Sequence, residues 1–397
     1  MTSGSGVVQE ALAERPPEAG PSVGAPALPR AGRLLFIDNL RILVIALVVI
    51  VHVAIVYGGL AADADAVAAD ALSSGVLLWL GLTAQAFAMG LLFAIAGYFT
   101  PGAYDRRGAW GFVRSRLLHL GVPLLFYDLV INPLIVFAAT AGRQGAPLST
   151  FVASYPSFIT GVGTGPTWFL LNLLLFDLGY VLWRHLRPAP PPPAGSATAP
   201  PAGRALVAYT LLLAVATYVV RLAFPVGWGG FFSLRLPYYP AYVSAFVIGA
   251  LAWRRGWLAH LSDRLGRGWL AIGAVAALLF PALLFSGEFG ALMGGPSPRA
   301  LLFALWEALV FVGLGVGLLW LFRRRVNRQG ALAAELSASA YAVYLLHVPV
   351  IALLNRGLLP LGLYPLLGFA LASASALPLC VLIGALARRL PLVRRVL

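Results

Sequence analysis

Apolar residues recur along this chain in long runs, separated by shorter polar or basic stretches. A helix of about 20 apolar residues crosses the hydrocarbon core of a bilayer, so each run predicts a membrane-spanning helix. The predicted spans are 34–57, 76–99, 119–140, 167–184, 205–224, 238–253, 269–286, 301–322, 337–354 and 364–387. The pattern therefore predicts an all-α, polytopic transmembrane bundle of about ten helices over residues 34–387.

Three stretches lie outside these spans and carry no apolar core of their own. Residues 1–33 are polar and rich in Ala, Pro and Gly, which predicts a disordered cytoplasmic tail and not a cleavable signal peptide. Residues 188–203 are rich in Pro and Ala and predict a semi-rigid cytoplasmic linker. Residues 388–397 predict a short basic cytoplasmic tail.

Composition supports a membrane protein. Hydrophobic residues make up 60% of the 397 residues and charged residues 11%, too few to cover a water-facing surface. The net charge of +14 comes from arginine alone. When loops alternate between the two sides, only Arg143, Arg221, Arg235, Arg299 and Arg356 fall on the outer side. This positive-inside bias predicts a multi-pass protein of the cytoplasmic membrane with both termini inside. The basicity thus indicates topology and a lipid bilayer, not nucleic acid.

Several site classes are not indicated by the sequence. Cys380 is the only cysteine, which excludes intramolecular disulfides and a cysteine-based zinc site. The histidines are too scattered to suggest a metal site, and neither a phosphate loop nor a dinucleotide fingerprint is present. We therefore expect no metal and no bound cofactor.

Arg41 and His52 are the most informative polar residues of the first span. Eleven residues separate them, which is about 16 Å of helix rise and places both on one face. Arg41 is predicted at the cytoplasmic interface, where it can hold a phosphate, and His52 near mid-membrane, where it can take a proton from a hydroxyl. Asp38 most simply pairs with Arg41. A snorkelling arginine and a histidine bonded to a neighbouring helix are the simpler alternative.

Basic side chains also mark the entry to the third span, in the cytoplasmic connection 112–123. Arg114, Arg116 and His119 are candidates for binding an anionic ligand from the cytoplasm. Positive-inside topology alone explains the same residues, and without further context it is the favoured interpretation.

A polar stripe runs along the ninth span. Ser337, Tyr341, Tyr344 and His347 recur at helical spacing and predict one face that reaches from the cytoplasmic end towards mid-membrane. The stripe either belongs to an active site or consists of core groups that bond between helices.

On the outer side, a glycine-rich turn at 161–165 leads into Trp168, with Asn172 one helical turn further in. Trp168 is either an interfacial belt residue or a platform for a sugar face. Asp128, Asp177 and Glu307 also fall within spans, as neutral acids, ion-pair partners or parts of a proton path. Of the three, Glu307 is the preferred acceptor-side candidate because it enters from the same side as Trp168.

The first span resembles the opening of the membrane-bound acyltransferase 3 family, in residues 34–41 followed by His52. Residues 93–99, 112–123 and 339–347 are similar, in order, to three further stretches of that family. Residues 165–170 and 240–253 resemble the branch that contains glucan biosynthesis protein C, which is glucan succinyltransferase-like. The resemblance covers about 34–387.

The resemblance implies an integral membrane O-acyltransferase that moves an acyl group from cytoplasmic acyl-CoA to a hydroxyl of a carbohydrate or glycosylated acceptor. It implies that His52 is the catalytic histidine and that Arg41 is its partner on the CoA side. The family commonly has a second arginine three residues after the first in the basic stretch, where this chain has His119 after Arg116. Phosphate binding there is expected to be weaker or to rest on Arg114 and Arg116.

A transporter that moves a glycan, lipid or drug without acyl chemistry is the alternative. Transporters often carry inverted repeats with broken spans at matching positions. We find no such repeat in the sequence, which favours the enzyme.

Overall fold

The computed structural model describes residues 34–60, 67–139, 145–161, 165–188, 198–228, 234–285, 288–391 and 393. It separates into two compact units, Met1–Leu34 and Leu35–Leu397. Only Leu34 of the first unit is described, so the predicted tail at 1–33 lies outside the described residues, as do 189–197 of the predicted linker and residues 392 and 394–397 of the predicted basic C-terminal tail.

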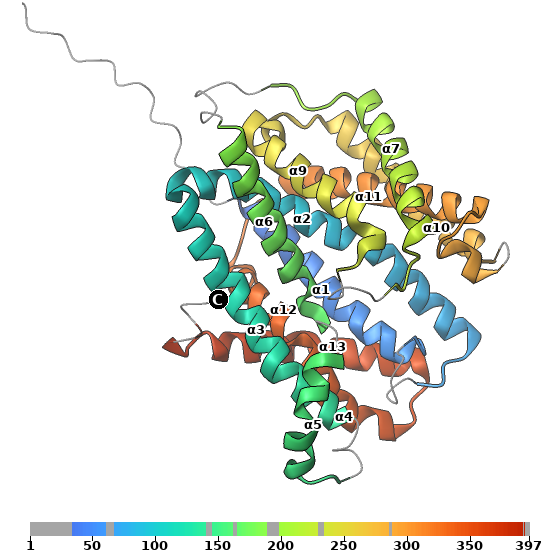
Figure 1. Cartoon of the computed structure of the whole chain (residues 1–397). Coiled ribbons are helices and arrows are strands. Elements are labelled where there is room, and N and C mark those ends of the chain that lie inside the picture. The colour runs from blue at the N-terminus through green and yellow to red at the C-terminus, as the bar shows by residue number, and fades with distance from the viewer. Residues whose placement is uncertain are drawn as a thin grey trace, which may run out of the picture. The chain divides into compact units, whose positions relative to one another are not determined.

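All secondary structure in the described part of the second unit is helical (Figure 1). The long helices are α1 (Leu35–Tyr57), α2 (Ala71–Arg116), α6 (Trp168–Leu186), α7 (Gly203–Ala223), α9 (Tyr239–Arg255), α10 (Asp263–Phe285), α11 (Pro298–Arg325), α12 (Ala331–Leu358) and α13 (Pro365–Ala387). Shorter helices are α3 (Val122–Phe126), α4 (Asn132–Ala139) and α5 (Leu148–Gly161). Single turns are π-helical at η1 (Leu117–Gly121) and η2 (Tyr127–Ile131), and 3₁₀ at η4 (Gly165–Thr167), η5 (Leu236–Tyr238), η6 (Trp257–His260), η7 (Phe289–Leu292) and η8 (Leu359–Leu361).

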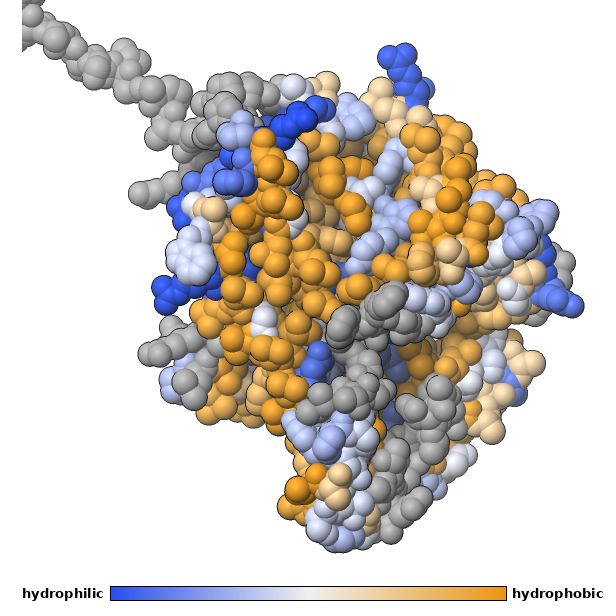
Figure 2. Space-filling model, in the orientation of Figure 1, coloured by the Kyte–Doolittle hydropathy of each residue, from blue (hydrophilic) through white to orange (hydrophobic). Residues whose placement is uncertain are grey.

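Eight helical segments of the described chain are long and apolar enough to cross a membrane. One of them, Ala71–Ala138, contains two of the predicted spans. α9 has 17 residues, at the lower limit for a span. Figure 2 shows hydrophobic residues over much of one face. Among the described residues, leucines such as Leu212 of α7 and Leu278 of α10 are largely exposed. The chain is a multi-pass membrane protein.

Two predicted non-spanning stretches are helical in the structure. The basic connection after the second span continues as helix and bends at Gly108, whose φ of 67° and ψ of 172° suit only glycine. The outer segment 141–166 contains α5. The sequence pattern predicts only connecting segments at both places, because it detects apolar runs. Helices that join the spans are not apolar along their whole length, so the pattern does not indicate them.

α1 lies at the centre of the bundle, where it packs against α2, α11, α12 and α13. Apart from Asp38, Asn39, Arg41 and His52, its side chains are apolar, as expected of a helix packed among several others. The helix therefore places Arg41, whose side chain is partly exposed, and His52 beside its neighbours in the bundle.

Close backbone contact joins α2 to α9. A Cβ atom on Gly97 would lie 2.1 Å from the carbonyl oxygen of Phe246, and one on Gly249 would lie 2.0 Å from that of Ala94. Gly273 and Gly313 hold α10 against α11 in the same way. Lipid-embedded helices associate mainly through such packing of small residues, because the hydrophobic effect contributes little between them.

We expect Gly97→Ala to destabilise the bundle, because the added methyl group meets backbone that cannot move independently of its helix. Such overpacking costs about 1–3 kcal/mol. The matched control is Gly75→Ala in the same helix, where a Cβ meets nothing within 4 Å. Thermal unfolding of the detergent-purified protein should show a lower midpoint for Gly97→Ala and an unchanged or higher one for Gly75→Ala. Equal midpoints would contradict this packing.

Candidate functional site

A cavity of about 420 Å³ is lined by basic side chains from α1, α2 and η1, and we call it the basic cavity. Its polar lining consists of Arg41, Arg107, Ser115, Arg116, His119, Tyr341 and Tyr344. The remaining wall is apolar. The structure therefore brings together Arg41, Arg116, His119 and two tyrosines of the ninth-span stripe.

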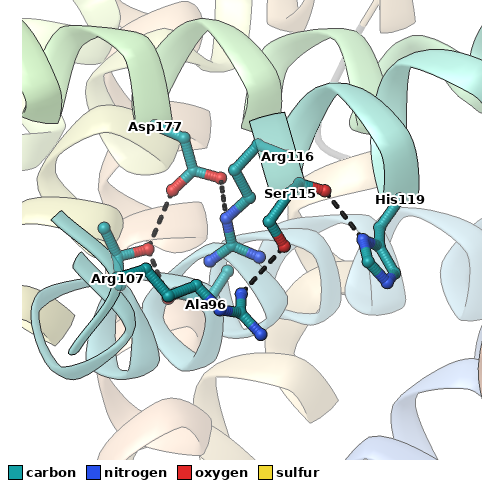
Figure 3. Close-up of polar contacts among 7 residues, drawn as sticks. Ala96, Arg107, Ser115, Arg116, His119 and Asp177 are labelled. Carbon is teal, nitrogen blue, oxygen red and sulfur yellow. Dashed lines mark hydrogen bonds and ion pairs between the residues drawn. The ribbon is translucent and has the colours of Figure 1, made fainter. Parts of the chain in front are cut away.

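Arg116 is held in the wall of this cavity by a buried carboxylate (Figure 3). Its Nε lies 3.0 Å from Oδ2 of Asp177, which is fully buried in α6. Thr100 donates a hydrogen bond of 2.8 Å to the other carboxylate oxygen. Asp177 thus positions Arg116. The sequence alone gives no reason to prefer Asp177 over Asp128 as a site residue.

Arg107 also lines the basic cavity, because the bend at Gly108 turns the chain back on itself. Its guanidinium donates a 2.8 Å hydrogen bond to the Ser115 hydroxyl, as Figure 3 shows. Sequence reasoning counted Arg107 only as part of the positive-inside bias. Its closeness to Arg116 depends on the Gly108 bend.

Of the other residues predicted on the donor side, Asp38 and His119 lie at or beside the basic cavity, and Arg114 does not. Asp38 lies 3.7 Å from Arg41, so the predicted ion pair is present. His119 lines the cavity, with its Nδ1 2.7 Å from the Ser115 carbonyl, and its own carbonyl accepts a 2.5 Å hydrogen bond from Tyr341. Arg114 is exposed and does not line the basic cavity.

His52 lines a second cavity of about 260 Å³, which we call the histidine cavity. Its other polar lining residues are Gln85, Trp168, Arg235, Tyr238 and Tyr344. Tyr344 therefore lines both cavities, and its hydroxyl donates to the carbonyl of Pro166. Arg41 and His52, on one helix, face two adjacent chambers.

His52 packs edge-on against His347, with ring centroids 4.5 Å apart. Nδ1 of His52 lies 2.8 Å from the Val48 carbonyl, and Nδ1 of His347 lies 2.6 Å from the Tyr344 carbonyl. A carbonyl only accepts, so each Nδ1 carries the hydrogen in the neutral ring and each Nε2 presents a lone pair. Nε2 of His347 is buried without a hydrogen-bond partner in the described chain. His52 can therefore act as a base or nucleophile through Nε2.

Trp168 is buried at the start of α6. It stacks on Tyr242 at 5.6 Å, and Tyr242 stacks on Tyr238 at 5.9 Å. Gln85 donates a 2.7 Å hydrogen bond to the Tyr242 hydroxyl. Trp168 and Tyr238 line one wall of the histidine cavity, and Tyr242 packs between them.

Arg235 also reaches this wall, with its guanidinium carbon 6.0 Å from the centre of the Trp168 ring. Its φ of 56° is left-handed, the one positive value of a non-glycine residue in the described chain. Such backbone strain costs about 1–3 kcal/mol and tends to persist at functional sites. One feature of the sequence could have pointed to Arg235: it is among the few arginines that fall on the outer side, against the positive-inside bias.

Two predicted acceptor-side residues lie elsewhere. Asn172 is buried, and its side-chain amide donates a hydrogen bond to the Trp168 carbonyl four residues earlier in α6. It lines neither the basic nor the histidine cavity. Glu307 forms a buried ion pair with Arg221 in a neighbouring small cavity. An unpaired arginine is costly in the membrane interior, and this pairing takes Glu307 away from the histidine cavity. Asp128 accepts a 2.7 Å hydrogen bond from Thr167, next to Trp168.

We expect Asp177→Asn to lower stability strongly, because it leaves the Arg116 charge without its buried partner. Breaking a buried pair costs about 3–5 kcal/mol. Asp263→Asn is the matched control: its pair with Arg324 is 3.6 Å long and both side chains are exposed. A pair of this kind contributes about 0–1 kcal/mol. Thermal midpoints in detergent should fall by several degrees more for Asp177→Asn, and similar midpoints would refute the role of this pair.

Comparison with known proteins identifies the chain at the level of its family. A family model described as an acyltransferase domain matches residues 34–385. This range contains both cavities and nearly all the described helices. No curated protein and no solved structure matches the chain significantly.

Proposed function

Because the chain belongs to the acyltransferase 3 family, it is a membrane acyltransferase, and we propose that it transfers an acyl group from cytoplasmic acyl-CoA to a hydroxyl of a carbohydrate or glycosylated acceptor. The observation that carries this proposal is the pair of cavities on either side of Tyr344. One is basic and suits a phosphorylated donor, and the other holds a histidine beside an aromatic wall.

The donor side is supported by the charges of the basic cavity. Arg41, Arg107 and Arg116 supply planar guanidinium groups, which match phosphate oxygens in geometry as well as in charge. We propose that they bind the CoA phosphates, together with His119. The pantetheine arm then extends inward past Tyr344 over the roughly 16 Å of helix rise between Arg41 and His52.

The chemistry is proposed at Nε2 of His52. In one route Nε2 removes the proton of an acceptor hydroxyl, whose oxygen attacks the thioester carbonyl. The C–S bond breaks, the acyl–oxygen bond forms, and the CoA thiolate takes the proton from the imidazolium. In the other route Nε2 attacks the thioester carbonyl and expels the CoA thiolate, which leaves an acyl-histidine. The acceptor oxygen then attacks the acyl carbon, the bond to Nε2 breaks, and the hydroxyl proton passes to the CoA thiolate. His347 holds the His52 ring in place in both.

The acceptor side is supported by the wall of the histidine cavity. Trp168 and Tyr238 offer apolar faces of the kind that pack against sugar rings, and Gln85 and Arg235 offer hydrogen-bond donors. We propose that a sugar hydroxyl enters here from the outer side. The likeness of 165–170 and 240–253 to the glucan-modifying branch makes succinyl transfer to a glucan one specific candidate.

We expect His52→Ala to reduce acyl transfer by at least about 100-fold, because general acid–base catalysis contributes about 10²–10⁴-fold. Purified protein in nanodiscs is given acetyl-CoA or succinyl-CoA with glucan oligosaccharides, and release of CoA and acylated product are measured. His260→Ala, at an exposed histidine in η6, is the control and should retain wild-type activity. Full activity of His52→Ala would refute the mechanism, and uptake of unmodified glycan without CoA release would favour a transporter.

We expect Arg116→Gln to raise the KM for acyl-CoA by about 10-fold or more, since a hydrogen bond to a charged group contributes about 1.5–3 kcal/mol. Arg114→Gln removes the same charge two residues away, outside the cavity, and should change KM less than twofold. The double variant with Asp177→Asn separates loss of phosphate binding from the cost of an unpaired carboxylate.

Acetyl-pantetheine, which lacks the CoA phosphates, distinguishes the two causes further. If Arg116 binds phosphate, Arg116→Gln should impair reaction with acetyl-CoA and leave that with acetyl-pantetheine unchanged. An equal loss with both donors would show that Arg116 only supports the fold.

A further inference from the structure

A groove of about 470 Å³ lies between α6 and α9, apart from the basic and histidine cavities. Its lining is almost entirely apolar and includes Leu175, Phe176, Trp183, Val243 and Val247. Phe176 and Phe246 meet at its floor, with ring centroids 5.7 Å apart. None of its residues lines the basic or the histidine cavity.

The groove opens towards the surrounding lipid. Leu175, Trp183, Val243 and Val247 are each more than 40% exposed. α6 and α9 lie side by side on the face turned to the viewer in Figure 1, and hydrophobic residues cover much of that face in Figure 2.

A positive charge marks one end of the groove. Arg254, at the end of α9, donates a 2.8 Å hydrogen bond to the Tyr180 hydroxyl. No carboxylate in the described part of the chain lies within ion-pair distance of Arg254, and its Nε has no hydrogen-bond partner there. Arg184, which donates to the same hydroxyl, is instead neutralised by Asp105 at 2.9 Å. Arg254 therefore offers uncompensated charge at the end where the chain is richest in arginine.

We propose that this groove binds an anionic phospholipid of the cytoplasmic leaflet, with an acyl chain between α6 and α9 and the phosphate at Arg254. Basic pockets between membrane helices on the cytoplasmic side suit such headgroups. Gly179 lines the groove, and a Cβ placed there meets nothing within 4 Å, so the space beside it is open. The same helix carries Asp177 and Trp168, so the lipid braces the helix on which both cavities depend. This proposal does not depend on the identity of the donor or acceptor.

The test measures lipid retained by the full-length protein. Protein exchanged into detergent with equal amounts of phosphatidylglycerol and phosphatidylcholine of matched chains is examined by native mass spectrometry. Wild type should retain phosphatidylglycerol preferentially, and Arg254→Gln should lower that preference about fivefold, as expected for one arginine near the membrane surface. Arg255→Gln is the matched control, because the neighbouring arginine is exposed and lies outside the groove.

Gly179→Leu tests the apolar part of the site. It should fill the groove and reduce retention of both lipids, while its gel-filtration profile stays that of wild type. Wild-type preference in Arg254→Gln, equal loss of preference in Arg255→Gln, or unchanged retention in a folded Gly179→Leu would each overturn the proposal. If Gly179→Leu fails to fold, the comparison of Arg254→Gln with Arg255→Gln decides alone.

Discussion

Lipid tails solvate neither charges nor backbone polar groups, and this constraint determines where the polar side chains of this bundle lie. In the interior of the bundle, Arg116 pairs with Asp177 and Arg221 pairs with Glu307. Each pair joins two helices that are distant in sequence, so the need to pair a buried charge also favours packing of those two helices against each other. The glycine contacts between α2 and α9 add close backbone packing elsewhere in the same bundle.

The same constraint makes the unpaired polar atoms informative. Nε2 of His347 is buried without a partner in the described chain, and Arg235 holds a strained backbone conformation beside Trp168. A bundle that only had to be stable would gain by replacing such groups with apolar ones. Both lie in or against the histidine cavity, which is where substrate groups are proposed to complete their hydrogen bonds.

Tyr344 connects the two halves of the proposed reaction. Its ring borders both cavities, and its hydroxyl is held by the Pro166 carbonyl at the turn that leads into Trp168. A side chain in this position separates the basic chamber from the chamber that contains His52. In the proposed reaction, such separation would keep water away from the donor until an acceptor is present.

Local sequence determined the class of protein, most of the predicted spans and the shared helix face of Arg41 and His52. Apolar run length and helical period are properties of neighbouring residues, so they can be read without the fold. The matched family also followed from short motifs that are contiguous in the chain. Only the tertiary structure decided that Asp177 belongs with Arg116, that Glu307 belongs with Arg221, and that Arg107 and Arg235 line cavities while Arg114 does not. These outcomes depend on which helices become neighbours and on the bend at Gly108, because a charge in lipid takes the partner that packing brings within reach.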